Sequence, residues 1–370
     1  MRFLIIDDHY PERFLAGWCA NRRTLGQRNY REGWRLLMDE GLGVGDFYSE
    51  GLRALGHEAA EIVPNCEPLQ RLWVEEQGVD LARTGIIDRL RRLVGRGASP
   101  SWINEIVAAQ IERIRPDVLI NHGMGRYDRR FLARIRPFVK LIVGQHASPI
   151  PPNVPFDCYD LMLSSLPNLV SYFRRLGLKS EYVRLGFGAS ILASVAPGPA
   201  VYEVSFIGGY SSAHGEGTKV LEQVAGEVPV DFWGYGADML SPGSPIHRRY
   251  HGEVWGLEMY RILAQSKIVL NRHIHVAENY ANNMRLYEAT GMGALLITDM
   301  KDNLNGLFEV GKEVVAYRSA EECIGLVKYY LRHEDERSMI AGAGQQRTLR
   351  EHTYHHRMRE LVDIAQRYLP

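Results

Sequence analysis

Short apolar runs alternate with longer amphipathic segments along the whole chain. In the first half, the apolar runs predict strands near residues 3–6, 59–63, 118–120, 139–143, 161–164 and 182–185. The segments between them predict helices near residues 49–55, 102–113, 129–136 and 168–176. Strands that alternate with helices are typical of a parallel sheet covered by helices, so the pattern predicts the α/β class.

A second series of the same kind follows. Strands are predicted near residues 204–207, 230–233, 268–270, 294–298 and 314–317, with helices near 218–225, 257–264, 284–290 and 320–331. The text between the two series, GFGASILASVAPGPA, is rich in Gly, Ala and Pro and is interpreted as a linker. We therefore expect two Rossmann-like domains in tandem, residues 1–190 and 200–355, followed by an amphipathic helix, 356–370, that packs back toward the first domain. Ligands of such sheets bind outside the carboxyl ends of the strands, so the expected site is a central cleft that the two domains face.

One stretch does not fit this scheme. Residues 9–41 form a long insertion after the first strand and contain Trp18, Trp34 and several arginines. Long insertions in compact domains are often functional, so this one is either an acceptor-binding loop or an ordinary surface helix.

Composition excludes several classes of protein. Of 370 residues, 45% are hydrophobic and 24% are charged, which is typical of a globular enzyme rather than a disordered chain. Lysine plus arginine equals aspartate plus glutamate at 44 each, so no net field favours nucleic acid. The N-terminus lacks the pattern of a signal peptide and no apolar stretch is long enough for a transmembrane segment, which predicts a cytoplasmic protein. The cysteines are scattered without metal-ligand spacing, so we expect reduced thiols and no metal site.

The segment NYANNMRLYEATGMGALLIT, residues 279–298, is the most informative about chemistry. Asn282, Asn283 and Met284 supply a helix start, where free amides and the helix dipole favour a phosphate. Arg285 would add a charge-assisted bond, and Glu288, one turn later, could accept both hydroxyls of a ribose. The alternative is that Arg285 and Glu288 are a solvated pair on a helix surface.

Further donor-side candidates lie at strand ends or at the tight turns that follow them. They are Gly208, Gly209, Gly234, Tyr235, Gly236, Asn271 and Arg272, with His273 next to the last. The glycines would let backbone amides approach phosphates, and an aromatic side chain could flank a nucleobase. Buried turn residues remain the alternative for each.

The first domain is expected to bind the acceptor. Asp7 and His9 follow the first strand, His122 follows the third, and Gln145 and His146 follow the fourth. A histidine at such a position can act as a base near neutral pH, and His146 is the first choice for the catalytic residue. The alternative is a loop histidine that hydrogen-bonds to the backbone.

The segment of residues 279–298 resembles the C-terminal signature of the group 1 glycosyltransferases, most closely the branch of spore-maturation protein CgeB-like enzymes. FIGGY from Phe206, FWGYG from Phe232 and LFEVGKEVVAYRSAEE from Leu307 extend the resemblance over residues 200–358. The first half is similar only loosely, at GLGVGDFYSEGLRALGHE, which contains Gly45.

The resemblance implies the GT-B architecture, a Glu288 that binds the ribose and a Lys219 that meets the diphosphate. It also implies retention of anomeric configuration. Many group 1 enzymes carry a second glutamate eight residues before the ribose glutamate, whereas this chain has Tyr280 there and Glu278 two residues earlier. Asn282 or Asn283 would then take over the contact with the donor sugar, and Gly45 joins the acceptor-side candidates.

We therefore expect an enzyme that transfers a hexose or N-acetylhexosamine from a nucleotide sugar, chiefly a UDP-sugar, to a hydroxyl acceptor. That acceptor would be a glycan, a lipid-linked group or a protein hydroxyl. No cofactor and no metal ion are expected, because positive groups would neutralise the leaving diphosphate. The rival hypotheses are a nucleotide-sugar epimerase or hydrolase on the same fold, and a catalytically silent nucleotide-sugar-binding protein. The sequence does not indicate an oligomeric state.

Overall fold

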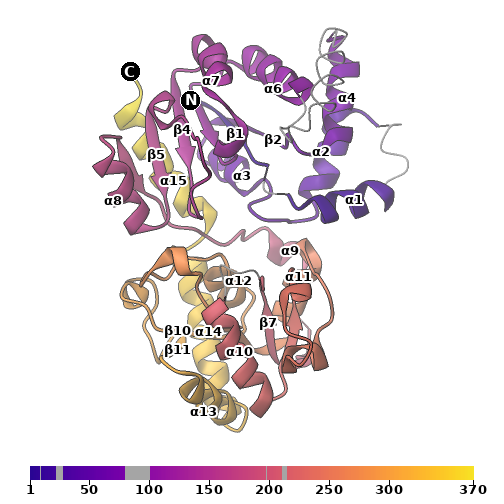
Figure 1. The fold of residues 1–370 in the computed structure, drawn as a ribbon, viewed down its shortest axis with the longest axis vertical. Coiled ribbons are helices and arrows are strands. Elements are labelled where there is room, and N and C mark those ends of the chain that lie inside the picture. The colour runs from indigo at the N-terminus through magenta and orange to yellow at the C-terminus, as the bar shows by residue number, and fades with distance from the viewer. Residues whose placement is uncertain (9, 22–27, 80–100, 197, 211–214) are drawn as a thin grey trace. The chain divides into compact units, whose positions relative to one another are not determined.

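The computed structural model describes residues 1–8, 10–21, 28–79, 101–196, 198–210 and 215–370 (Figure 1). The chain forms two compact units, each built on one parallel β-sheet with helices packed against it. The first unit comprises Met1–Ser164, Leu169–Val183 and Met358–Pro370, and the second comprises Ser165–Asn168 and Arg184–Arg357. The chain is thus an α/β protein with two Rossmann-like sheets, as its alternating pattern predicts.

The sheet of the first unit has the strand order β2-β1-β3-β4-β5-β6, with every neighbouring pair parallel. Its strands are β1 (Arg2–Ile6), β2 (Glu58–Ile62), β3 (Val118–Asn121), β4 (Leu141–Gln145), β5 (Leu161–Ser164) and β6 (Ser180–Tyr182). The central strands are buried along almost their whole length, which is why they read as unbroken apolar runs. Because Ile6 is in register with Asn121, and Asn121 with Gly144, the residues after these strands lie together at one edge of the sheet.

The helices of this unit are α1 (Glu12–Asn21), α2 (Tyr30–Met38), α3 (Phe47–Ala54), α4 (Glu67–Gln77), α6 (Ser101–Ile114), α7 (Arg129–Ile135) and most of α8 (Pro167–Arg175). Of these, α1 and α2 lie within the insertion of residues 9–41. The Asn29 side chain caps α2 by accepting from the Glu32 amide, and Trp34 Nε1 donates to the Glu61 carbonyl at 3.1 Å. The insertion therefore carries ordered helices, one of which is bonded to β2.

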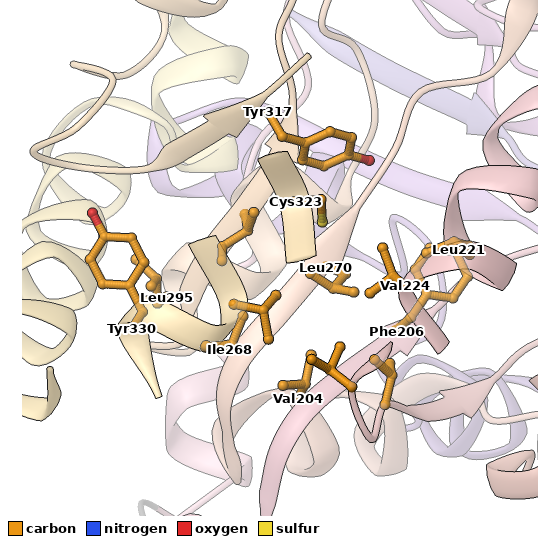
Figure 2. Close-up of a cluster of buried hydrophobic side chains, with 14 of the residues drawn as sticks. Val204, Phe206, Leu221, Val224, Ile268, Leu270, Leu295, Tyr317, Cys323 and Tyr330 are labelled. Atoms are coloured by element: carbon orange, nitrogen blue, oxygen red, sulfur yellow. The ribbon is translucent and has the colours of Figure 1, made fainter. Parts of the chain in front are cut away.

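The sheet of the second unit has the order β11-β10-β9-β7-β8 and is also parallel throughout. Its strands are β7 (Tyr202–Ile207), β8 (Asp231–Trp233), β9 (Ser266–Asn271), β10 (Leu295–Asp299) and β11 (Val315–Tyr317). Side chains from these strands and from three α-helices form one buried cluster, which includes Phe206, Leu270 and Tyr317 (Figure 2). This core holds the carboxyl ends of β7, β9 and β11 in fixed register.

The helices of this unit are α9 (Ile191–Ser194), α10 (Gly215–Glu227), α11 (Gly256–Ala264), α12 (Arg285–Gly291), α13 (Ala320–Tyr330), α14 (Glu334–Glu351) and the start of α15 (Tyr354–Tyr368). From Met358 onward α15 groups with the first unit, where Tyr368 donates to Glu181 at 2.8 Å. In the described part of the chain, no helix is both long enough and apolar enough to cross a membrane.

Several elements differ from those expected. Strand β4 lies two residues later than predicted, β6 lies two residues earlier, and the linker contains the short helix α9. Helices α4 and α14 were not predicted. In α14 a Cβ at Gly344 would lie 2.3 Å from the Glu313 carbonyl oxygen, so this glycine permits close packing of the helix.

Candidate functional site

Arg272 is a buried cation with no carboxylate at ion-pair distance among the described residues. It follows β9 and is 6% exposed; its Nη2 donates to the Gly209 carbonyl at 2.6 Å, and its guanidinium lies 5.4 Å from the centre of the Phe206 ring. It pairs with no carboxylate in the described part of the chain, and its Nε has no hydrogen-bond partner there. Burial lowers the pKa of this arginine to about 10. A buried charge without a partner is costly, so the arrangement favours an anion beside Arg272.

A pocket of about 650 Å³ opens beside Arg272. Four segments line it: the first turn of α10 at 215–217, the residues after β9 at 272–275 with Glu278, the last residue of β10 and the two after it at 299–301, and the last residue of β11 and the two after it at 317–319. We call it the second-unit pocket. Its size lies within the range of small-ligand sites, and it lies at the carboxyl edge of a parallel sheet, where such sites are expected.

The first turn of α10 brings backbone amides to the second-unit pocket. The helix begins at Gly215 and runs for 13 residues, so its dipole favours negative charge at this end. A Cβ at Gly217 would lie 2.3 Å from Cδ of Arg272, so glycine at this position lets the helix pack directly on the arginine. Arg272 and the start of α10 therefore form one electropositive wall.

His273, Asp299 and Lys301 form another part of the wall. Nδ1 of His273 lies 2.6 Å from Oδ1 of Asp299, the His273 amide donates to the same carboxylate at 3.2 Å, and Lys301 Nζ lies 3.4 Å from it. Burial raises the pKa of Asp299, but the hydrogen bond and charge of His273 and the charge of Lys301 outweigh it and leave that pKa below its usual value. Asp299 is therefore ionised near neutral pH.

The predicted donor-side glycines are explained by packing. A Cβ at Gly209 would lie 2.4 Å from the Tyr235 ring, and one at Gly234 would lie 1.7 Å from the Gly208 carbonyl oxygen. Gly236 adopts a φ of 80°, and Tyr235 stacks on Trp255 with ring centroids 6.0 Å apart. These residues lock the ends of β7 and β8 together beside Arg272, and a nucleotide role for them stays a prediction.

Asn271 and Asn283 form a hydrogen-bonded bridge behind Arg272. Asn283 Nδ2 donates to Asn271 Oδ1 at 2.8 Å and to the Arg272 carbonyl at 3.1 Å, while its Oδ1 accepts from the Leu286 amide at 3.3 Å. One amide at the start of α12 is thus already satisfied, and this helix has only seven residues. Asn282 and Met284 lie in the same turn, half-buried, and do not line the second-unit pocket.

Arg285 and Glu288 form a buried pair, which differs from the solvated pair stated as the alternative for them, and their roles toward phosphate and ribose stay predictions. Arg285 Nη1 lies 2.8 Å from Glu288 Oε2, and the side chains are 13% and 5% exposed. Tyr260 donates to the other Glu288 oxygen at 3.4 Å, and burial together with that carboxylate raises the pKa of Tyr260. Neither Arg285 nor Glu288 lines the second-unit pocket.

Lys219 is not among the residues that line the second-unit pocket, and the diphosphate role implied by the resemblance stays a prediction. Its side chain is exposed, whereas Glu216, Gly217 and Val220 line the pocket. Arg272 supplies the buried positive charge instead.

In the first unit, the carboxyl edge of the sheet gathers the acceptor-side candidates. His122 Nδ1 lies 4.0 Å from Asp7 Oδ2, and both side chains are buried. The Tyr48 ring packs edge-on against His122 at 5.2 Å, and its hydroxyl accepts from Gln145 Nε2 at 2.7 Å. Gly45, with φ of 47°, forms the turn that leads into α3 and so places Tyr48.

His146 makes the local contacts of a loop histidine. Its Nε2 lies 3.1 Å from the Pro149 carbonyl oxygen and 3.1 Å from Ser148 Oγ. This geometry agrees with the alternative stated for it, and a catalytic role for His146 stays a prediction. His9 lies outside the described residues.

Comparison with known proteins gives the fold and a partial family match. Residues 218–363, most of the second unit, match the model of a family described as glycosyl transferase-like. No curated protein matches the chain in sequence. The fold is that of the GT-B glycosyltransferases.

Three solved structures illustrate this likeness, each with a TM-score of 0.59 and 11% identity. A glycosyltransferase from Rickettsia africae aligns over 100% of this chain and 98% of its own. The Anabaena protein HepE, solved in complex with UDP-glucose, aligns over 99% and 100%. A sucrose-phosphate synthase from Thermosynechococcus elongatus aligns over 99% and 98%. At this identity the likeness shows the fold, and the CgeB-like branch remains a hypothesis.

Sequence reasoning missed several residues of these sites. Asp299 ends β10 and Lys301 lies two residues later, while Tyr317 ends β11 and Arg318 follows it, so the strand-end rule could have found them. Tyr48 in α3 gave no such signal, because its place beside His122 depends on contacts between distant segments.

Proposed function

We propose that this protein is a metal-independent glycosyltransferase that transfers a hexose or N-acetylhexosamine from a UDP-sugar to a hydroxyl acceptor, with retention of configuration. The nucleotide sugar would bind in the second-unit pocket. The partial family match and the GT-B fold support glycosyl transfer, and the chemistry of the pocket supports a diphosphate ligand.

Arg272 is the single observation that carries this proposal. Its charge is buried, unpaired by any carboxylate of the described residues, and adjacent to the start of α10. A diphosphate would supply the missing negative charge. When its bond to the sugar breaks, the diphosphate would carry one further negative charge, which Arg272 and the α10 amides would stabilise without rearrangement. Lys301 and the exposed Arg318 add positive charge at the rim.

The first unit would bind the acceptor at its cluster of Asp7, His122, Tyr48 and Gln145. Neutral and ionised groups that can hydrogen-bond a sugar hydroxyl are gathered there. A glycan, a lipid-linked sugar or a protein hydroxyl would each offer such a group.

The test is calorimetric titration of UDP and UDP-glucose, the ligand present in the HepE structure, into wild type and Arg272→Gln. Loss of a hydrogen bond to a charged partner should weaken UDP binding about 10- to 150-fold. Arg261→Gln, on the exposed face of α11, is the matched control and should bind like wild type. Equal affinity of Arg272→Gln and wild type would remove the diphosphate from this pocket.

Transfer itself is measured by product analysis with a panel of acceptors, in EDTA and with Mg²⁺. We expect product only with acceptor, at equal rates in both conditions, and with the anomeric configuration of the donor. Release of sugar without acceptor would instead identify a hydrolase, an altered sugar an epimerase, and binding without any reaction a silent binder.

A further inference from the structure

The strongest unassigned feature of the second-unit pocket is His273. The residue lines the pocket next to Arg272, and its imidazole is fully buried behind that lining. Its Nε2 has no hydrogen-bond partner in the described part of the chain. A buried polar atom without a partner costs free energy, so a protein that retains one favours a ligand that satisfies it.

Asp299 determines which proton the imidazole carries. A carboxylate can only accept, so the nitrogen that faces it, Nδ1, must hold a hydrogen. In the neutral imidazole Nε2 then carries a lone pair and accepts, and in the imidazolium it donates. A ligand hydroxyl can serve in either state, because a hydroxyl both donates and accepts, whereas a phosphate oxygen could only accept.

The ring is held firmly in this orientation. Asp299 receives the His273 amide as well as Nδ1, and Lys301 lies 3.4 Å away on the same carboxylate. Lys301 Nζ also donates to the Glu278 carbonyl at 3.2 Å, which joins this group to the loop that borders the pocket. A fixed imidazole can select among ligands by the position of one hydroxyl.

We propose that His273, oriented by Asp299, is a specificity-determining residue that hydrogen-bonds one hydroxyl of the bound nucleotide sugar. The inference rests on the proposed function, because it takes the second-unit pocket as the donor site. It assigns the hydroxyl contact to a histidine after β9 rather than to Asn282 or Asn283. Asn283 is already bonded to Asn271, Arg272 and Leu286.

Two substitutions separate the two nitrogens of the ring. His273→Asn keeps an amide where Nδ1 faces Asp299 but has no atom at the position of Nε2, whereas His273→Gln can reach that position. His247→Asn, on an exposed segment, is the control for the substitution itself. Circular dichroism and thermal unfolding establish that each variant is folded.

The measurement is the affinity for UDP-glucose and for its 2-, 3-, 4- and 6-deoxy analogues and the analogue with 2′-deoxyribose. In wild type, one analogue should bind about 3- to 10-fold more weakly than UDP-glucose, the effect of one lost neutral hydrogen bond. His273→Asn should bind that analogue and UDP-glucose equally, and His273→Gln should recover part of the difference. Weaker binding of one deoxy-sugar analogue would place the hydroxyl on the donor sugar, and weaker binding of the 2′-deoxyribose analogue would place it on the ribose.

The outcomes separate this inference from the function on which it rests. If wild type binds neither UDP nor UDP-glucose, nor the ADP, GDP and dTDP counterparts, the proposed function fails. If nucleotide sugars bind but His273→Asn keeps the wild-type preference among the analogues, the function stands and the role of His273 is wrong. A uniform loss across UDP and all analogues would assign His273 to phosphate and overturn the hydroxyl assignment.

Discussion

Arg272 and Arg285 of the second unit have different partners, and we expect different functions for them as a result. Arg285 lies 2.8 Å from the Glu288 carboxylate, so its charge is neutralised within the chain. Arg272 is buried more deeply, and its contacts among the described residues are to a carbonyl, a hydroxyl and a ring, with the Asp299 charge acting on it from beyond ion-pair distance. Removing one partner of a buried pair leaves an uncompensated charge, whereas Arg272 has no such close partner to lose. Arg285 is therefore expected to contribute chiefly to stability, and Arg272 chiefly to ligand binding.

Glu288→Gln should consequently destabilise the fold. The change leaves Arg285 buried without its carboxylate, so the free energy of unfolding should fall by about 3 kcal/mol in urea denaturation. The double variant Arg285→Met with Glu288→Leu removes both charges and should recover most of that loss. Stability unchanged within about 0.5 kcal/mol would mean that the pair is solvated after all.

The same Glu288 variant tests the ribose role that the family resemblance implies. If both ribose hydroxyls donate to Glu288, Glu288→Gln should weaken UDP binding by about 10- to 150-fold in calorimetric titration. UDP affinity equal to that of wild type, in a folded variant, would remove Glu288 from the nucleotide site.

At the scale of an element, the loop between β9 and α12 contains a strained turn. Glu278 has φ of 48° and ψ of −121°, and the Tyr280 amide donates to the Ala277 carbonyl at 2.9 Å across it. This is the first central position of a type II′ turn, which glycine normally occupies. Lys301 Nζ bonds the Glu278 carbonyl, and Asn303 bonds Ala281 through both its amide and its carbonyl. These contacts from the segment after β10 hold the turn beside the second-unit pocket.

Glu278→Gly should relieve this strain. Glycine adopts the conformation freely, so we expect the free energy of unfolding to rise by about 1 kcal/mol, net of glycine's greater freedom in the unfolded chain. Asn279→Gly, at the next position with negative φ, is the matched control and should lower stability by about 0.5 kcal/mol. Urea denaturation measures both, and equal destabilisation by the two glycines would show that the turn stores no strain.

At the scale of the whole molecule, each unit has its own sheet and its own carboxyl edge. The proposed donor pocket is built entirely from residues of the second unit, and the proposed acceptor cluster entirely from residues of the first. Binding of a nucleotide alone should therefore slow amide hydrogen exchange in the second unit and leave it unchanged in the first.

Hydrogen exchange with and without UDP tests this division. At about 100 times its dissociation constant, UDP can stabilise the state that binds it by about 2.7 kcal/mol. Amides of the first turn of α10 and of residues 272–275 should then exchange up to about 100-fold more slowly, while those of β1, β3 and β4 stay unchanged. Protection confined to residues 282–288 would instead place the diphosphate at the start of α12, as the sequence first suggested.

The alternation of apolar runs and amphipathic segments determined the class, the strands and most of the helices, because burial on both faces of a parallel strand and on one face of a helix imposes a local period. It failed where glycine served packing rather than a turn, as at Gly344 in α14. Strand-end positions likewise pointed to Asp7, His122 and Gln145, which the register of β1, β3 and β4 brings to one edge.

Tertiary structure alone decided which of these candidates share a site. Arg272 and His273 line the second-unit pocket with Asp299, while Glu288 turns to Arg285 and Lys219 turns to solvent. The physical reason is that a sequence pattern specifies which side chains are available, but a charge is paired or unpaired through contacts between segments far apart in the chain. Asp299 reaches His273 across 26 residues and Arg272 reaches Gly209 across 63, and no local period encodes either contact.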